Sequence, residues 1–263
     1  MNPVNALPHP AAWRVSAAAF RLQLRGISWL SLLVGAAIQP ATYVTLTLAA
    51  NRTGRLDADA LVLGSGVLAA WTATLWHSGM VLRKEFWSGT LPAVCSRPGG
   101  LGPVLVGKTV AATVLSVGVI MLSVALAAVL SGHRVRIADP TAFTAALVMG
   151  VVATIPLGLL VACLFLLTRA AIRVAEVLVY PVLIIGGLLI PLTELPGWIQ
   201  PLAGGLSLHW VSVLLTDAAA GRPSATTAWC ALAATGLLYT AAARLAFRRV
   251  LHRARKEGNL EIF

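Results

Sequence analysis

One stretch of the sequence has the residue types and the spacing of a phosphate-binding loop. Residues 102–109 read GPVLVGKT and match the pattern G-x-x-x-x-G-K-[ST], in which backbone amides and a lysine hold the phosphates of a nucleotide. Such a loop normally follows a buried strand and opens a helix of a soluble α/β domain. Here the stretch runs directly into a long apolar segment from about Val104, and no acidic metal-binding strand follows. We therefore expect no nucleotide site in this chain.

Other patterns that carry chemistry are missing from the sequence. It contains no G-x-S-x-G or H-E-x-x-H motif and no pair of carboxylates within an apolar segment. His77 lies near the end of such a segment without a partner at metal-ligand spacing, so packing or headgroup contact is its expected role. The cysteines are equally isolated, at Cys95, Cys163 and Cys230. We expect a protein that is not an enzyme and binds no metal or cofactor of its own.

The composition places the chain in a membrane. Hydrophobic residues make up 58% and charged residues 11% of its 263 positions, against about 25% charged residues in a soluble domain. The net charge of +11 would suggest nucleic acid for a soluble protein. Here the basic residues flank apolar segments, as is typical of topology determinants and lipid headgroup contacts. We expect membrane lipids, and not nucleic acid, as partners.

Six apolar segments must position any functional residue. They cover Ile27–Ala50, Ala60–Leu82, Val104–Leu130, Thr141–Leu167, Val177–Leu192 and Ala225–Phe247. All but the fifth exceed the roughly 20 residues that cross a bilayer core. The fifth is expected to be bent or broken, because it contains Pro181, Gly186, Gly187 and Pro191. The sequence predicts an all-α membrane protein with six transmembrane helices in a single domain over residues 1–263.

The basic residues between these segments indicate an orientation. If the N-terminus lies inside, the only Lys or Arg residues outside are Arg52, Arg55, Arg134, Arg136 and Arg222. All others then lie on the inner side, in agreement with the positive-inside rule. Both termini are therefore expected in the cytoplasm.

Three further segments are expected not to span the membrane. Residues 12–28 place three arginines on one helical face beside an apolar stripe, which predicts an interfacial helix that bends at Gly26. A simple extension of the first span is the alternative. Residues 83–108 form the longest inner loop. Residues 194–222 are apolar but broken by Pro and Gly, which predicts two short helices dipping into the outer leaflet as a re-entrant hairpin.

The middles of the apolar segments contain no Asp, Glu, Lys or Arg. Ion-coupled transporters usually keep an ionisable group near the midplane despite its cost. If this chain moves a substrate, we expect the energy to come from another polypeptide.

Two stretches carry a family resemblance. The first follows the second apolar segment and contains Glu85, Gly89-Thr90-Leu91, Pro98 and Gly107-Lys108. The second precedes the sixth segment and contains Pro191, Leu195-Pro196-Gly197-Trp198-Ile199 and a short segment over Leu206–Asp217. Together with length and span number, they resemble the permease subunits of type-2 ABC exporters, a group that includes drug, antibiotic and lipid-linked export systems.

The resemblance implies a transport subunit of a bacterial cell membrane. Two copies of a separate ATPase would use ATP and Mg²⁺, and a second permease chain would complete a homodimer or a heterodimer. The residues implied for ATPase coupling are Arg83, Lys84, Glu85, Phe86, Gly89, Thr90 and Leu91 of a cytoplasmic coupling helix, with Arg14, Arg21 and Arg25 nearby.

The resemblance also implies a substrate path lined mainly by spans one, two and five. Candidate lining residues are Gln39, Tyr43, Trp71 and Trp76, for which ordinary packing is the alternative role. A path so poor in charge suits an amphipathic or lipid-like cargo. The other functions left open are a polytopic membrane anchor or assembly protein without transport, and a secondary transporter.

Overall fold

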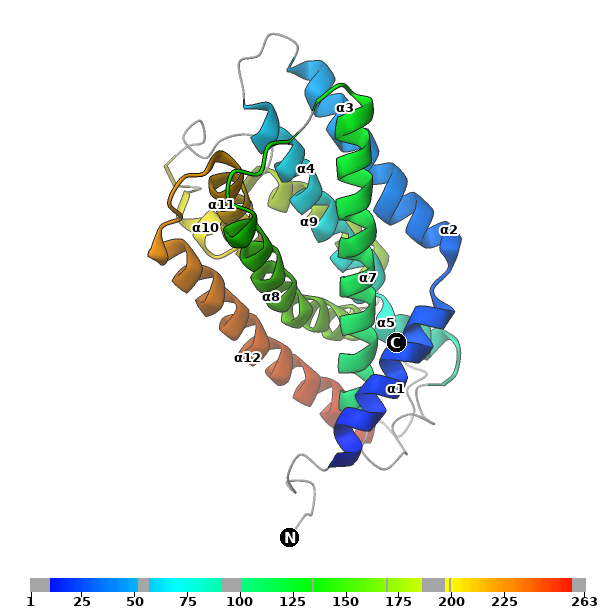
Figure 1. Cartoon of the computed structure of the whole chain (residues 1–263). Coiled ribbons are helices and arrows are strands. Elements are labelled where there is room, and N and C mark those ends of the chain that lie inside the picture. The colour runs from blue at the N-terminus through cyan, green and yellow to red at the C-terminus, as the bar shows by residue number, and fades with distance from the viewer. Residues whose placement is uncertain are drawn as a thin grey trace.

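The computed structural model describes residues 10–51, 57–90, 101–133, 135–168, 170–185, 197–198 and 200–256. All regular secondary structure in these ranges is helical (Figure 1). The α-helices are α1 (Pro10–Gly26), α2 (Trp29–Leu32), α3 (Gln39–Ala50), α4 (Ala58–Ala73), α5 (Val81–Trp87), α7 (Leu101–Leu130), α8 (Pro140–Leu167), α9 (Ala171–Ile185), α10 (Gln200–Gly204), α11 (Ser207–Ala220) and α12 (Thr226–Lys256). Two π-helical segments, η2 (Leu33–Ile38) and η3 (Thr74–Ser78), interrupt the first two apolar stretches.

Five helical stretches among the described residues are long and apolar enough to cross a membrane. They are Leu33–Ala50, Ala58–Trp87, Leu101–Leu130, Pro140–Leu167 and Thr226–His252. The all-helical class and five of the six expected apolar helices are thereby confirmed. The remaining expected span, Val177–Leu192, is described only as far as Ile185 in α9. The complete six-span topology stays a prediction.

Three clusters of buried apolar side chains hold the bundle together. The largest lies among α4, α8, α11 and α12, and the second among η2, α3, α4 and α7. The third joins α5, the first turns of α7, and the last turns of α8 and α12. α4 contributes to the first two clusters from opposite sides, which explains why Leu61 to Ala69 are all buried.

The N-terminal segment forms a helix of its own. α1 ends at Gly26 and is separated from α2 by a bend at Ile27–Ser28. In Figure 1, α1 crosses the lower end of α7 obliquely, and α1 packs closely on that helix. The helix covers nearly the range expected for the interfacial helix, residues 12–28.

The inner loop is shorter than the sequence indicates. α7 begins at Leu101, so that residues 101–108 are helical and Lys108 lies two turns inside the helix rather than in a loop. Pro103 is compatible with this because proline is tolerated in the first turn of a helix, where amides lack intrahelical partners. At the other end of the loop, α5 stops at Trp87 instead of extending to Leu91. The expected loop 83–108 therefore has a helix at each end.

At the end of the bundle opposite α5, polar side chains hold the starts and ends of several helices. Asp139 accepts hydrogen bonds from the amides of Thr141 and Ala142 at the start of α8. The Ala142 amide, with the Thr141 hydroxyl, keeps the pKa of the Asp139 carboxyl below its ordinary value. Between α4 and the end of α7, Asp59 Oδ1 lies 2.7 Å from His133 Nε2.

The segment expected as a re-entrant hairpin contains two short helices, α10 and α11. α11 packs against α8, α12 and α4. Residues 194–196 and 199 fall outside the described residues, and the re-entrant arrangement stays a prediction.

Candidate functional site

A groove of about 570 Å³ lies between the first two apolar helices and α9. It is lined by Leu30, Val34, Gly35, Gln39, Thr72, Ala73, Trp76, His77, Met80, Lys84, Trp87 and Ile172. Most of these side chains are apolar, and the four polar ones belong to Gln39, Thr72, His77 and Lys84. A groove of this composition suits a ligand with a large apolar part and a small polar part.

Both π-helical segments contribute to this groove. Val34 and Gly35 come from η2, and Trp76 and His77 come from η3. The two segments touch, because a Cβ atom on Gly35 would lie 3.2 Å from Cε1 of His77. Short π-helical turns inside α-helices occur frequently at functional sites. The coincidence of two of them on one groove marks this region as the candidate site.

His77 is buried against the back of the groove. Its Nδ1 lies 3.1 Å from the hydroxyl of Ser116 on α7, and only 8% of the residue is exposed. The sequence predicts only a packing or headgroup role for His77. No local pattern distinguishes it, because Ser116 and Gly35 are far from it in the sequence.

The structure brings two of the four candidate path residues to the groove. Gln39 and Trp76 line it. Tyr43 lies one turn from Gln39 and accepts a hydrogen bond from its Nε2 at 2.7 Å. Trp71 is buried in the largest apolar cluster instead, and its indole Nε1 has no hydrogen-bond partner among the described residues.

Arg83 of α5 holds the end of α8. Its guanidinium donates hydrogen bonds to the carbonyls of Phe165 and Thr168, at 3.0 and 2.9 Å. These are carbonyls of the last helical turn, which lack intrahelical partners and favour a positive charge. The same guanidinium lies 5.4 Å from the ring centroid of Trp87, within cation–π range.

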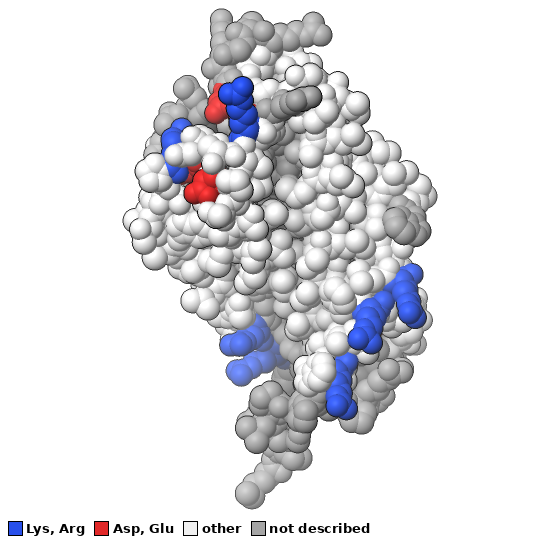
Figure 2. All heavy atoms as spheres, viewed as in Figure 1, with Lys and Arg blue, Asp and Glu red and all other residues white. Residues whose placement is uncertain are grey.

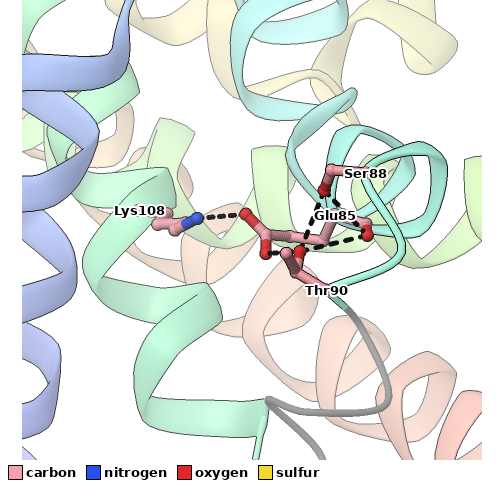
Figure 3. Close-up of polar contacts among 4 residues, drawn as sticks. All are labelled: Glu85, Ser88, Thr90 and Lys108. Atoms are coloured by element: carbon pink, nitrogen blue, oxygen red, sulfur yellow. Dashed lines mark hydrogen bonds and ion pairs between the residues drawn. The ribbon is translucent and has the colours of Figure 1, made fainter.

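Glu85 of α5 forms an ion pair with Lys108 of α7 (Figure 3). Only 15% of the Glu85 side chain and 11% of the Lys108 side chain are exposed. Thr90 donates a hydrogen bond of 2.7 Å to the second carboxylate oxygen of Glu85, and Ser88 lies 2.9 Å from the Thr90 hydroxyl. The pair therefore joins the two ends of the inner loop.

The remaining predicted coupling residues differ in exposure. Phe86 is partly buried and packs against the cluster formed by α5, α7, α8 and α12. Lys84, Gly89 and Thr90 are exposed, as is Trp87 beside them. Gly89 has a φ of 68°, a left-handed conformation that glycine adopts without strain and that ends the helix. Leu91 lies outside the described residues.

The arginines of α1 form a separate basic surface. Arg14, Arg21 and Arg25 are all exposed. In the face shown by Figure 2, Lys and Arg side chains gather toward the lower end, over α1 and beside it. α1 rests on α7, where Ser16 donates a hydrogen bond of 2.9 Å to the Pro103 carbonyl. α7 thus supports both α1 and, through Lys108, α5.

The stretch that matches a phosphate-loop pattern lies in the first turns of α7, which contact both α1 and α5. Residues 102–109 are helical, whereas a phosphate loop presents its amides from a non-helical turn. Gly107 faces the backbone of α1, and Lys108 binds Glu85. Both residues therefore have roles in helix packing. Among the described residues, no group of three or more His, Cys, Asp or Glu side chains could hold a metal ion.

No family model matches the sequence, and no curated protein matches it either.

Proposed function

We propose that this chain is the permease subunit of an ATP-driven exporter of the type-2 ABC class. It is not an enzyme in this proposal, since separate ATPase subunits hydrolyse ATP with Mg²⁺. Two permease chains, identical or related, would combine with two ATPase copies. The observation that supports it best is the attachment of α5, which carries an exposed surface and is fixed to two membrane helices at the end of the groove.

The contacts of α5 suggest how force would pass into the membrane. Arg83 ties the helix to the end of α8, and Glu85 ties it to the start of α7. α5 also follows η3 after a turn at Gly79–Met80, and η3 lines the groove. A push on the exposed surface of α5 would move these elements together, as in the rigid-body motions of other transporters.

The groove supports an amphipathic cargo, such as a drug, an antibiotic or a lipid-like molecule. Its walls are largely apolar, with Gln39, His77 and Lys84 spread along its length. Export fits the orientation expected from the charge distribution, in which the α5 end of the bundle faces the cytoplasm of a bacterial cell.

The ATPase-coupling part of the proposal is tested at Trp87, which is 59% exposed on α5. The proposal requires an ABC ATPase encoded beside this chain; co-expression with that ATPase provides the complex, and ATP-dependent export and co-purification are measured. We expect Trp87→Ala to reduce both at least about fivefold, the size of loss found when an aromatic residue at an interface hot spot is truncated. The matched control is Trp198→Ala, because Trp198 is 71% exposed before α10 and far from α5 in sequence.

The proposed substrate path is tested by placing a larger side chain in the groove. Val34 and Leu33 are neighbours in η2 with exposures of 52% and 55%, but only Val34 lines the groove. We expect Val34→Trp to block export while ATPase binding persists, and Leu33→Trp to leave both intact. Retained ATPase binding with no export in the wild type would instead favour a membrane anchor. Export without any ATPase would favour a secondary transporter.

A further inference from the structure

A second, smaller crevice lies away from the groove, between α7, α8 and α12. Its volume is about 240 Å³. The lining side chains are Gly102, Leu105, Val106, Pro156, Leu159, Cys163, Thr240, Ala243, Arg244 and Phe247. No residue is shared with the groove, so the crevice is an independent feature of the fold.

Small residues on three helices create the crevice. A Cβ atom on Gly102 would come within 3.7 Å of the Phe247 ring, so glycine leaves that side of the ring open. Pro156 lies inside α8 and lacks the amide that would continue the helical hydrogen bonding. Thr240 and Ala243 provide short side chains on α12. The resulting hollow is apolar except at its edge.

The edge of the crevice carries a strong positive charge. Arg244 lines it and is exposed, and Arg248 follows one helical turn later, also exposed. Neither has a hydrogen-bond or ion-pair partner among the described residues. The sequence from Ala218 to Lys256 contains no Asp or Glu. The basic end of α12 therefore has no acidic partner within its own helix.

The crevice lies at the same end of the bundle as the other basic elements. It is formed by the start of α7 and the later turns of α8 and α12. That end also contains the exposed arginines of α1 and the charged residues of α5. By the positive-inside rule this is the cytoplasmic end, where the membrane leaflet carries its anionic lipids.

We propose that this crevice binds one anionic phospholipid of the inner leaflet. The phosphate head group lies against Arg244, with Arg248 beside it, and part of an acyl chain fills the apolar hollow between α7, α8 and α12. Charge complementarity selects this occupant, since basic pockets between membrane helices on the cytoplasmic side are typical sites for anionic lipid head groups. The lipid would bridge three helices that the Phe247 ring and its neighbours leave incompletely packed.

The test uses the purified full-length chain in detergent, with no ATPase and no cargo. Bound lipid is counted by native mass spectrometry during titration with dioleoyl phosphatidylglycerol or with dioleoyl phosphatidylcholine. We expect one phosphatidylglycerol per chain to bind more tightly than phosphatidylcholine. Arg244→Gln should weaken this binding about fivefold, the typical contribution of one basic residue near an anionic membrane surface. Arg21→Gln, at an exposed arginine of α1, should change it little.

A second pair of variants tests the hollow itself. Val106 and Val114 lie two turns apart on α7 with exposures of 41% and 46%, and only Val106 lines the crevice. We expect Val106→Trp to abolish the single tight site and Val114→Trp to retain it. Equal binding of the two lipids, equal effects of the two arginine variants, or equal effects of the two valine variants would overturn the proposal. Export activity enters none of these measurements, so they fail or succeed independently of the transport function.

Discussion

The ion pair between Glu85 and Lys108 fixes α5 against α7 at one end of the helical bundle. Each side chain is largely shielded from solvent, and the carboxylate is also held by Thr90. Removing one partner of such a pair leaves an uncompensated charge in a poorly hydrated site, whereas removing both avoids that cost. The pair is therefore expected to position α5 on α7 rather than to add much net stability.

This role predicts a non-additive response to mutation. Glu85→Gln should lower the free energy of unfolding by about 2 kcal/mol, less than for a fully buried pair because both groups retain some exposure. The Glu85→Gln/Lys108→Gln double variant should recover part of that loss. The measurement is denaturant unfolding in detergent micelles. Lys84→Gln is the control, and a Glu85→Gln effect no larger than that of the control would contradict the positioning role.

The close packing of α1 on α7 depends on a glycine at position 107. A Cβ atom there would lie 2.2 Å from the carbonyl oxygen of Ser16, too close to be accommodated without moving the α1 backbone. Glycine is needed for the close approach of two helices and not for a phosphate. By contrast, Gly118, three turns further along α7, has nothing within 4 Å of a Cβ atom.

These two glycines form a matched pair of test positions. Gly107→Ala should displace α1 and destabilise the fold by about 1–3 kcal/mol, the usual range for overpacking. Gly118→Ala should be neutral or slightly stabilising, since alanine favours a helix over glycine. Thermal unfolding and the rate of tryptic cleavage at the arginines of α1 would show the difference. Equal behaviour of both variants would mean that α1 does not pack tightly on α7.

At the scale of the whole molecule, charge and apolar surface are segregated along the bundle. The visible face in Figure 2 has a broad belt without described charged residues, with Lys and Arg below it and a small mixed group above it. Such a belt matches a bilayer core, and the unequal charge at its two ends matches the positive-inside rule.

The orientation can be measured with single cysteines in a variant that lacks Cys95, Cys163 and Cys230. Ser131 follows α7 at the end that is expected to face outward, and Ser88 follows α5 at the end that is expected to face the cytoplasm; both are exposed. We expect a membrane-impermeant maleimide to label Ser131→Cys in intact cells and Ser88→Cys only after permeabilisation. Labelling in the reverse pattern would place the termini outside the cell.

The sequence by itself determined the class of protein and the position of most helices along the chain. Apolar content and the flanking basic residues are local properties, so five membrane-length helices could be assigned without knowing their neighbours. The separate helix α1 followed from its arginines and from Gly26. The predicted limits of the helices on either side of the inner loop were less accurate, because the helical state of residues 101–108 depends on the partners of Gly107 and Lys108.

Only the tertiary structure decided which side chains meet. α4 and α8 are apolar on all sides, and an evenly apolar helix does not encode the direction in which each side chain points. For this reason Trp71 and Trp76, five residues apart, were equal candidates for the path, whereas one is buried in the core and the other lines the groove. Likewise, the sequence could not predict that His77 contacts Ser116 or that Arg244 lines the crevice between three helices, since these neighbours come from distant parts of the chain.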